Sequence, residues 1–591
     1  MLNDGGWGTG DGGRRTDDQN PKPTTKLKTN MKQLIECVPN FSEGNDLSII
    51  KQITDEIEKV SGVMLLDVDP GKATNRTVVT FVGEPEPVIE AAFLAIKKAS
   101  ELIDMRKHKG EHPRMGATDV CPLIPVSGIS MEETAAWAVK LASRVGKELA
   151  IPAYLYEYAQ PNKERNNLSV IRGGEYEGFF DKIKLPEWKP DFGPSVFNER
   201  AGGTVIGARD FLIAYNINLN TKSVRLANSV AFDVREAGRV KREGDPITGK
   251  VVKDAEGNDV RIPGTLKACK AIGWFIEEYG IAQISMNLTN YKITPVHKAF
   301  DEVCKSADRR GLRVTGSELV GLIPLEAMLE AGKYFLQKQK RSIGVSETEL
   351  IQIAIKSLGL DELGPFDPQQ KIIEYKLRNA SDEKLIGLNL RAFADETASE
   401  SPAPGGGSIS AYVGSLGASL GTMVANLSAG KRGWEAQYED FSKWAALGQA
   451  TKDKLLKAVD EDTKAFNKIM EAFGLPKSNE AEKKARTAAI EAATKYACEV
   501  PFEVMQTAYG ILPMLKEMVI KGNQNSITDA GVGVLCIKTA VRGAYFNVLV
   551  NAKGLKDEAY AKEIVAKAKA LLQENHSACD AILEDVEKAI A

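Results

Sequence analysis

The chain has 591 residues, of which 43% are hydrophobic, 27% charged and 7% aromatic. At roughly 100–200 residues per domain, this length predicts about three to five domains, and the composition is that of a folded globular chain. The 77 lysines and arginines nearly balance the 80 aspartates and glutamates, and the formal net charge is -3. No general positive field is available to bind nucleic acid or an anionic membrane, so we expect any anion site to be local.

Cysteines and histidines are few and widely spaced. The seven cysteines form no CxxC pair, which argues against a disulfide framework or a zinc site and favours a reducing, cytoplasmic location. Only four histidines are present, so we expect no metal centre built from them. Each histidine is therefore a candidate by itself: His108, His112, His297 and His576.

Residues 1–30 are polar, irregular in order and almost free of apolar side chains, which predicts a disordered leader. Gly8, Gly10 and Gly13 match GxGxxG, but no strand-like run precedes them and no helical pattern follows, so a dinucleotide site is not expected. The leader also lacks an apolar signal core and is too acidic for a transit peptide. Met31 is a candidate for the functional start.

After Met31 the sequence alternates between short apolar runs and amphipathic stretches. LIECV, VMLLDVD and TVVTFVG are strand-like, and VIEAAFLAIKKASELI has helical spacing. The same alternation returns as FLIAYNINL, KSVRLANSVAFDVREAG, IAQISMNL and VHKAFDEVCKSADRRG. This pattern predicts two successive α/β subdomains, which we place at residues 31–211 and 212–376.

Residues 243–264 interrupt the second subdomain with two short polar runs. These runs flank Glu256, Gly257 and Asn258, which is a typical turn sequence. We expect an exposed hairpin here.

Beyond Leu377 the strand-like runs stop, and Ala, Leu, Lys and Glu recur at helical spacing. We place a linker at residues 377–384 and an all-helical domain at residues 385–591. Within it, Ser401–Gly430 has no formal charge and is long enough to span a membrane. Its many Gly and Ser residues make transfer into lipid unfavourable. We instead expect close helix packing at four small residues, Gly414, Gly417, Ala418 and Gly421.

The segment HKGEHPRMG, residues 108–116, is the first candidate for chemistry. His108 and His112 have the i,i+4 spacing of a metal pair, but the glycine and proline in the segment disfavour a helix and no third ligand is evident. A histidine beside a guanidinium suits proton transfer near neutral pH, with Arg114 holding an anion. From these residues alone, a loop histidine without a catalytic role is an equally good interpretation.

Longer motifs resemble known families. CVPNFSEG, LLDVDPG, TNRTVVTFVG, GEHPRMGATDVCP and DFGPSVF resemble the formiminotransferase family, and APGGGS, VDEDTKAF and RGAYFNVLVN resemble cyclodeaminase. Together these motifs cover nearly everything after Met31. Their order is that of the bifunctional formimidoyltransferase-cyclodeaminase family, whose members move a formimino group from formiminoglutamate to tetrahydrofolate and then release ammonia.

For the first half, the resemblance implies two ferredoxin-like α/β subdomains with folate in a groove between them. His112 matches the family's catalytic histidine, and Asp69 and Arg114 match polar positions of the folate site. The sequence departs from the family in its leader, its hairpin and Lys109, where some relatives carry another histidine. The family's folate-binding segment falls on Gly193, Pro194, Ser195, Val196, Phe197, Asn198, Glu199, Arg200, Ala201 and Gly202.

Formimino transfer requires the folate N5 amine to attack an amidine-like carbon and lose a proton, while the departing glutamate nitrogen gains one. One histidine can do both in sequence. Arg114 suits a substrate carboxylate, which a guanidinium binds in bidentate fashion. Asp69 is suited to orient the imidazole or to hold a pterin nitrogen. Without the family match, an aspartate in a turn at the end of a strand is an equally good interpretation.

For the second half, the resemblance implies a helical bundle that dimerises, and Asp462 matches the family's catalytic aspartate. Asp460 lies two residues away and on a helix faces elsewhere, so no shared-proton pair is expected and one of the two should point inward. Without the resemblance, the better interpretation is that both acidic residues lie on a solvent-exposed face of a helix. We expect folate near Gly405, Gly406, Gly407 and Ser408, with Gly522, Asn523, Ser526 and Asp529 as weaker candidates for the same pocket.

The resemblance thus implies a cytoplasmic homo-oligomer that uses formiminoglutamate and a polyglutamylated tetrahydrofolate, without a metal, nucleic acid or membrane span. Two alternatives remain open at this point. The first half could use formylglutamate as its donor, because formyl and formimino carbons differ by one heteroatom. One half could instead be a non-catalytic folate-binding or assembly module, against which the intact His112 and Asp462 argue.

Overall fold

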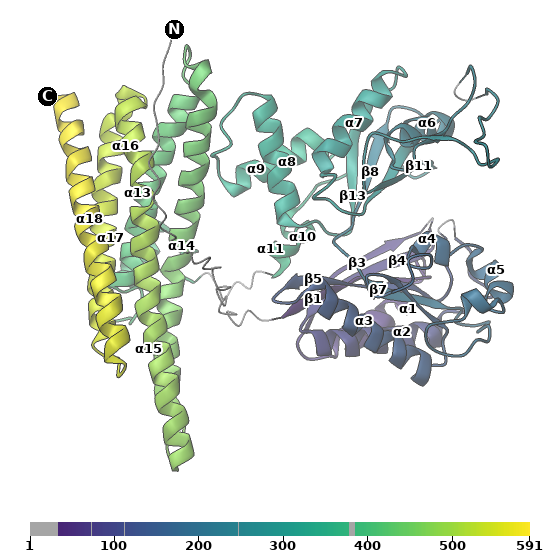
Figure 1. The fold of residues 1–591 in the computed structure, drawn as a ribbon, viewed down its shortest axis with the longest axis horizontal. Helices are drawn as coiled ribbons and strands as arrows, with labels where there is room; N and C mark the ends of the chain where they lie inside the picture. The colour runs from purple at the N-terminus through teal and green to yellow at the C-terminus, as the bar shows by residue number, and fades with distance from the viewer. Residues whose placement is uncertain (1–32, 73, 111–112, 246–247, 378–383) are drawn as a thin grey trace, which may run out of the picture. The chain divides into compact units, whose positions relative to one another are not determined.

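The structure is a computed structural model. It describes residues 33–72, 74–110, 113–245, 248–377 and 384–591 (Figure 1). The expected leader and most of the expected linker lie outside them, and the proposed domain boundaries stay predictions. The chain divides into two compact units. The first contains residues up to Leu65 and Pro70–Arg209, and the second contains Leu66–Asp69 and Asp210–Ala591.

The first unit is built on a seven-stranded mixed sheet of order β1-β4-β2-β5-β7-β6, with β3 paired to β4. The pairs β1–β4 and β1–β5 are antiparallel, whereas β5, β7 and β6 run parallel. Helices α2 and α3 pack on this sheet (Figure 1). The strands are β1 (Leu34–Cys37), β2 (Asn40–Phe41), β3 (Val63–Gly71), β4 (Arg76–Gly83), β5 (Thr118–Ser127), β6 (Ala153–Glu157) and β7 (Thr204–Ala208).

Helix starts in this unit follow local capping chemistry. Asp46 accepts hydrogen bonds from the first-turn amides of α1, and Ser130 and Glu133 form a reciprocal capping box on α3. Helix α2 begins at a proline, which lacks the N–H that a first turn leaves unpaired. The helices are α1 (Leu47–Glu58), α2 (Pro85–Leu102), α3 (Met131–Glu148), α4 (Leu168–Ile171) and α5 (Glu175–Lys182).

The second unit begins with a four-stranded antiparallel sheet of order β11-β12-β8-β13. Alternate residues of β8 separate its faces: Tyr215, Ile217 and Leu219 belong to an apolar core with α6 and α7, while Asn216 and Asn218 point the other way. Its strands are β8 (Ile213–Leu219), β9 (Arg239–Val240), β10 (Arg261–Ile262), β11 (Cys269–Ile276), β12 (Ile281–Leu288) and β13 (Val314–Val320). Its helices are α6 (Val224–Val234), α7 (Val296–Asp308), α8 (Leu325–Lys338), α9 (Glu347–Leu358), α10 (Pro368–Lys371) and α11 (Ile373–Leu377).

The expected hairpin is present. Strands β9 and β10 pair antiparallel, and an isolated bridge joins Lys253 to Asp259 nearer the tip. Asp254 Oδ1 accepts hydrogen bonds from the amides of Glu256 and Asn258, and Gly257 has φ 84°, a conformation that favours glycine.

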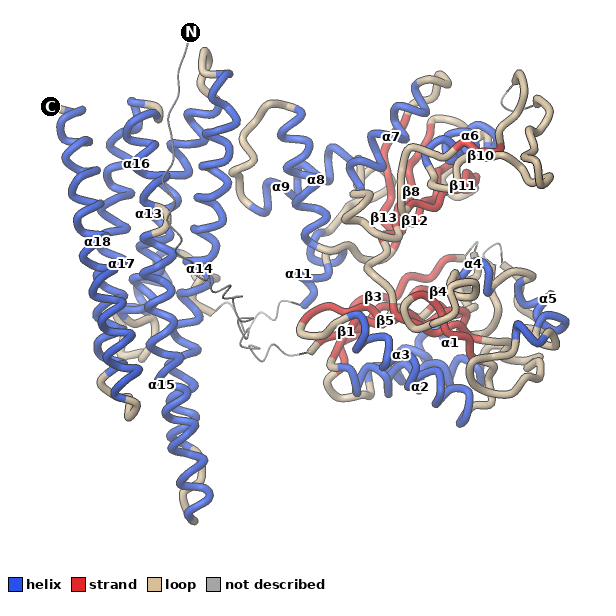
Figure 2. The backbone as a smooth tube through the Cα atoms, viewed as in Figure 1, coloured by secondary structure: helices blue, strands red, loops and turns tan. Residues whose placement is uncertain are grey.

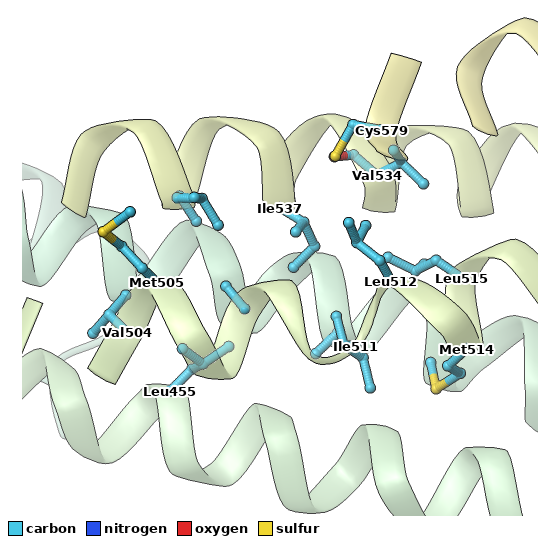
Figure 3. Packing of buried hydrophobic residues seen from close by; sticks show 14 of the residues in the cluster. Leu455, Val504, Met505, Ile511, Leu512, Met514, Leu515, Val534, Ile537 and Cys579 are labelled. Atoms are coloured by element: carbon cyan, nitrogen blue, oxygen red, sulfur yellow. The ribbon is translucent and has the colours of Figure 1, made fainter. Parts of the chain in front are cut away.

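From α12 onward the described residues form helices and no strand, as Figure 2 shows. Helices α13, α14, α15, α17 and α18 pack side by side around an apolar core that includes Leu455, Met505 and Ile537 (Figure 3). The predicted α+β region followed by a helical region is therefore confirmed. The helices are α12 (Leu390–Thr397), α13 (Gly406–Ala429), α14 (Tyr438–Gly474), α15 (Glu480–Tyr509), α16 (Leu512–Lys521), α17 (Ile527–Ala552) and α18 (Glu558–Ile590).

The uncharged segment predicted to pack closely is helix α13. A Cβ at Gly417 would lie 2.8 Å from the Gly533 carbonyl oxygen on α17, and one at Gly421 would lie 2.4 Å from Met514 of α16. The absence of side chains at these glycines lets α13 approach its neighbours more closely than other residues would allow. The expected packing role of the small residues is confirmed.

One stretch of the described residues, Gln524–Ala552, is long and apolar enough to cross a membrane by length and composition. A core helix of a soluble bundle passes the same test. Helix α17, which makes up most of this stretch, packs against α13, α15, α16 and α18.

Candidate functional sites

In the first unit, the candidate loop at residues 108–116 and the segment 193–202 lie against each other. The amide of Met105 donates to the Arg200 carbonyl at 2.9 Å, and that of Ala117 donates to the Ala201 carbonyl at 2.8 Å. Gly202 has φ 68°, and a Cβ there would lie 2.2 Å from the Met115 carbonyl oxygen. The fold thus brings together two segments that are some eighty residues apart in sequence, as the resemblance implies.

Some side chains of residues 193–202 pack against neighbouring residues, and others are exposed to solvent. The Phe197 ring packs on Tyr176, Phe179 and Phe180, while Val196 is 68% exposed. Within the same segment, the Asn198 side chain accepts a hydrogen bond from the Ala201 amide. The segment is thus an irregular loop with one aromatic anchor and an exposed apolar residue beside it.

His112 and Glu111 lie outside the described residues, so the catalytic role expected for His112 stays a prediction. His108 is described and has two ring contacts. Its Nε2 lies 2.9 Å from the Asn75 carbonyl, and its Nδ1 accepts a hydrogen bond from Arg114 Nε at 3.2 Å. Because Arg114 can only donate, Nδ1 carries no proton and Nε2–H donates to Asn75. His108 therefore supports the loop through both of its ring nitrogens.

Arg114 is buried, with 8% of its side chain exposed, and its guanidinium is paired. It binds both oxygens of Glu177, at 2.6 and 2.8 Å, and Glu175 at 3.1 Å. This pairing raises the pKa of Arg114 and holds that of Glu177 below its usual range. Glu177 is itself 65% exposed, so a substrate carboxylate would have to replace an accessible side chain.

A pocket of about 490 Å³ adjoins this ion pair. Arg114, Glu175 and Glu177 form one side of it, and Lys109 and Gly110 of the candidate loop form another. Lys109, the position at which the sequence departs from some relatives, therefore lines the pocket.

Asp119 positions the same loop, and the sequence analysis did not single it out. Its side chain is fully buried, accepts a hydrogen bond from the Met115 amide at 3.0 Å and pairs with Arg172. An aspartate at the start of an apolar strand is the only sequence signal for it. Its carboxylate fixes the backbone directly after Arg114.

Asp69 belongs to the second unit, where its carboxylate acts on Tyr279. Burial and then Glu318, with Asp69 as a smaller cause, raise the pKa of Tyr279 to about 12. The Tyr279 hydroxyl donates to Glu318 Oε1 at 3.1 Å, and the Gln283 amide donates to Glu318 Oε2 at 3.1 Å. Asp69 thus lies next to a polar network on the face of the four-stranded sheet that is turned away from α6 and α7.

This sheet-face network was also missed by the sequence analysis. Gln283 donates to Asn218 at 2.9 Å and accepts from the Trp274 indole at 3.1 Å. Asn216 donates to Glu318 at 3.0 Å. Alternation along β8 separates these polar residues from the apolar core, but only the pairing of β8 with β12 and β13 brings their side chains together.

In the helical region, the APGGGS turn and Asp462 meet. Gly405 is the N-cap of α13 and offers no capping side chain, and Asp462 on α14 lies at this helix start. A Cβ at Gly407 would lie 2.2 Å from Asp462 Oδ1, so only glycine allows this approach. Ser408 Oγ lies 3.1 Å from Asp462 Oδ2.

The Asp462 carboxyl has an environment that favours its neutral form. Burial raises the pKa of Asp462, and hydrogen bonding from Ser408 to the carboxylate is the smaller, opposing influence. Asn547, from the RGAYFNVLVN motif on α17, approaches Gly406 at the same helix start. A partly buried carboxyl, a helix N-terminus and an amide side chain therefore meet at one place.

Asp460 faces elsewhere, as its spacing from Asp462 predicted. It is 6% exposed and accepts hydrogen bonds from the amides of Leu385 at 2.8 Å and Ile386 at 3.4 Å. Asp460 is thus the more buried of the two. It anchors the chain that enters the helical region.

The weaker candidates Gly522 and Asn523 do not share the pocket of Asp462 within the chain. The Asn523 amide donates to Ser428 Oγ at 2.9 Å, near the C-terminal end of α13. Ser428 is about 30 Å along this helix from Ser408 at the usual 1.5 Å rise per residue. The expectation was wrong because α13 runs the length of the bundle and separates its two ends. Gly522 instead lines a cavity of about 1120 Å³ with Trp434 and Trp444.

Among the described residues, no group of three or more His, Cys, Asp or Glu side chains is arranged to hold a metal ion. All seven cysteines are free thiols.

Comparisons with known proteins agree with this arrangement. Three family models match consecutive regions: the formiminotransferase domain, N-terminal subdomain, at residues 34–209; the formiminotransferase domain at 214–378; and formiminotransferase-cyclodeaminase at 389–570. The chain is 42% identical over 558 residues to formimidoyltransferase-cyclodeaminase of Rattus norvegicus, covering 94% of this chain and 99% of the relative. The chain belongs to the formimidoyltransferase-cyclodeaminase family.

Other relatives match one part of the chain each. Glutamate formimidoyltransferase of Thermoplasma acidophilum is 43% identical over 306 residues, covering 51% of this chain and 92% of the relative. Methenyltetrahydrofolate cyclohydrolase of Methylorubrum extorquens is 36% identical over 201 residues, covering 34% of this chain and 97% of the relative. Relatives of both kinds therefore exist as separate chains.

The contacts of Asp460 predict a structural role that Asp462 does not share. In Asp460→Asn, one of the two backbone amides faces an NH₂ group in place of an oxygen, which should lower the free energy of unfolding by about 1–3 kcal/mol. Asp462→Asn should not lower it. Chemical denaturation of the full chain at pH 7 measures the free energy of unfolding of both variants. An Asp460→Asn variant as stable as the unaltered chain would contradict the structural role of Asp460.

Proposed function

We propose that the two halves of this bifunctional folate enzyme act in sequence on one folate. The first half transfers the formimino group of N-formimino-L-glutamate to tetrahydrofolate. The helical half then cyclises formimino-tetrahydrofolate to methenyl-tetrahydrofolate and releases ammonia. The observation that carries this proposal is the meeting of the APGGGS turn with Asp462, a carboxyl whose pKa burial raises.

In the transfer, N5 of tetrahydrofolate attacks the formimino carbon and the bond from that carbon to the glutamate nitrogen breaks. We assign the proton movement to His112, which takes the N5 proton and gives it to the departing nitrogen. The contacts of residues 193–202 with the flanks of the 108–116 loop support their assignment to the folate. Arg114 would bind a carboxylate in place of Glu177, and Asp69 would contact the pterin or the imidazole.

In the ring closure, N10 attacks the formimino carbon and the former imino nitrogen leaves as ammonia. Asp462 supplies a proton to that nitrogen. The start of α13, from Gly405 to Ser408, has backbone amides that suit a pterin oxygen or a carboxylate. The proposed steps use protein side chains as acid and base and include no metal.

Several finer features belong to the same proposal. The two α/β parts would be ferredoxin-like subdomains, and the folate would be polyglutamylated. Free thiols at all seven cysteines support a cytoplasmic location. The near-neutral net charge supports a protein without nucleic-acid or membrane partners.

We also propose that the chain forms a homo-oligomer, in which the helical region contributes one interface. Exposed apolar residues recur at helical spacing on α13 and on α17, and these helices touch where Gly417 meets Gly533. Helix α13 carries no charge, so a second copy could cover its part of this face without burying an unpaired ion. On α17 the exposed Arg542 lies between Leu535 and Phe546 at the same helical spacing, so it would need a partner in the second copy. The exposed residues are Leu416, Met423, Leu427, Val532, Leu535, Phe546 and Val550.

A coupled assay tests the overall proposal. Formiminoglutamate and tetrahydrofolate should yield methenyl-tetrahydrofolate, followed by its absorbance, together with ammonia. Formylglutamate offered in place of formiminoglutamate should yield no folate product. Absence of both products from the folded chain would reject the proposal.

The variant His112→Ala should lose formimino transfer by about 10²–10⁴-fold, because the proton shuttle is removed. Cyclisation of supplied formimino-tetrahydrofolate should be unchanged. His108→Ala should have a smaller effect, since His108 supports the loop through Asn75 and Arg114. His576→Ala, on α18, is the neutral control. Transfer at the normal rate in His112→Ala would exclude this histidine.

Asp462→Asn should slow ring closure by about 10²-fold or more, because the amide has no acidic proton to give. Formimino-tetrahydrofolate should then accumulate in the coupled assay. The matched control is Asp453→Asn, a half-exposed aspartate on the same helix. Normal turnover by Asp462→Asn would assign the proton to another group.

Leu416→Glu should dissociate the oligomer, because it places a charge within the apolar face. Sedimentation velocity should show the unaltered chain as a homo-oligomer and the variant as a smaller species. Leu390→Glu changes an apolar residue of α12 that is 75% exposed and lies outside this face, so it should leave the size unchanged. An unaltered chain that sediments as a monomer would refute the interface.

A further inference from the structure

The Ser408 hydroxyl lies between two oxygen atoms of α14. It is 2.9 Å from the Val459 carbonyl and 3.1 Å from Asp462 Oδ2. Ser408 is fully buried. Both contacts are within hydrogen-bond distance, so the position of each hydrogen atom decides what this site can do.

A hydroxyl has one hydrogen to donate, whereas a backbone carbonyl has none. When Ser408 donates to Val459, its oxygen can take part in the second contact only as an acceptor. The hydrogen between Ser408 and Asp462 must then belong to Asp462. In the alternative arrangement Ser408 donates to an ionised Asp462 and gives up the shorter contact with Val459.

Burial raises the pKa of Asp462 more than the hydrogen bond from the Ser408 backbone amide to this carboxyl lowers it. Helix α13, which faces it, has no charged residue. On α14 itself, Asp460 is turned to the amides of Leu385 and Ile386, and Glu461 pairs with Lys464. From α15, Tyr496 donates to Glu461, and α17 contributes the neutral Asn547. Because none of these described groups is a cation facing Asp462, a carboxylate here would be partly buried and unpaired, which is costly.

We propose that Ser408 is a positioning residue: it donates its hydrogen to Val459 and accepts the O–H of Asp462, which keeps Asp462 protonated until the reaction needs the proton. This inference rests on the proposed role of Asp462 as the acid of ring closure. It assigns Ser408 to the acid, and not to direct contact with folate.

The proton balance of ring closure is consistent with this arrangement. The imino nitrogen of formimino-tetrahydrofolate carries one hydrogen and leaves as ammonia, so it must gain two. The N10 proton supplies one and the Asp462 O–H supplies the other. As the carbon–nitrogen bond breaks, the product is the methenyl cation and Asp462 is left as a carboxylate, which water then reprotonates.

The test is the pH dependence of ring closure on supplied formimino-tetrahydrofolate. The rate should fall at high pH as Asp462 loses its proton. In Ser408→Ala the acid loses its acceptor, so this fall should begin about one pH unit lower, and the rate on the alkaline side should drop about tenfold. Ser410→Ala is the matched control, because Ser410 is on the same helix and its hydroxyl donates to the Gly406 carbonyl in place of Asp462 or Val459.

Two results would overturn the proposal. A fall that moves to higher pH in Ser408→Ala would show that Ser408 donates to a carboxylate. A lower rate with an unchanged pH profile would show a purely structural or substrate-binding role. Normal ring closure by Asp462→Asn would instead reject the proposed function of Asp462, so the two failures are distinguishable.

A stability measurement tests the proposal without altering Ser408. A carboxyl whose pKa is raised in the folded chain stabilises it below its unfolded pKa, and this stability is lost as pH rises through the folded pKa. The amide of Asp462→Asn donates to Ser408 as a protonated carboxyl does, without titrating. Its free energy of unfolding should therefore match the unaltered chain at low pH and equal or exceed it at pH 8. A variant that is less stable at pH 8 would overturn the proposal.

Discussion

The helical half depends on the close approach of α13 to α14, α16 and α17. Glycines at 407, 417 and 421 remove the side chains that would hold these helices apart, and the first of them admits the Asp462 carboxylate. A charged residue at the buried positions of α13 would have no partner at this distance, which explains in physical terms why those positions are uncharged. The glycines that close helix packing requires and the glycine that admits Asp462 therefore lie on the same helix.

The first unit positions its site by a different means, because its functional residues lie on loops. Asp119 holds the Met115 amide, Gly202 allows the 193–202 segment to approach Met115, and Asn75 contacts the same loop through the Lys109 carbonyl. Each contact is to the backbone, so these contacts to Lys109 and Met115 do not depend on the side chains of the two residues. The side chain of Arg114 is then held by glutamates that a ligand could replace.

The sequence predicted the elements better than the contacts between them. Apolar runs and helical spacing identified β8, β12, α2, α6 and α7, and the loss of strand-like runs beyond Leu377 identified the helical region. The roles of Asp119 and Asp460 could not be predicted, because the amides they bind come from distant or irregular backbone that has no sequence pattern. The prediction that Gly522 and Asn523 share the pocket of Asp462 was wrong for the same reason. The periodicity of a helix does not show which end of a bundle a neighbouring segment contacts. His112, which only the resemblance supports, stays a prediction.

The two acids of the proposed reactions face opposite physical problems. An imidazole titrates near neutral pH without help, so it can serve from a loop, whereas a carboxyl must be kept from ionising. Asp462 lies at the N-terminus of α13, where the helix dipole favours the anion by about 0.3–1 kcal/mol at exposed sites and at most ~2 kcal/mol. Burial can raise a carboxyl pKa by as much as ~3–5 units, each worth about 1.4 kcal/mol. Even partial burial therefore outweighs the dipole, in agreement with the raised pKa of Asp462. The helix start can then stabilise the carboxylate that remains after the proton has been given to the departing nitrogen. The same position therefore favours the neutral acid before the reaction and tolerates its anion afterwards.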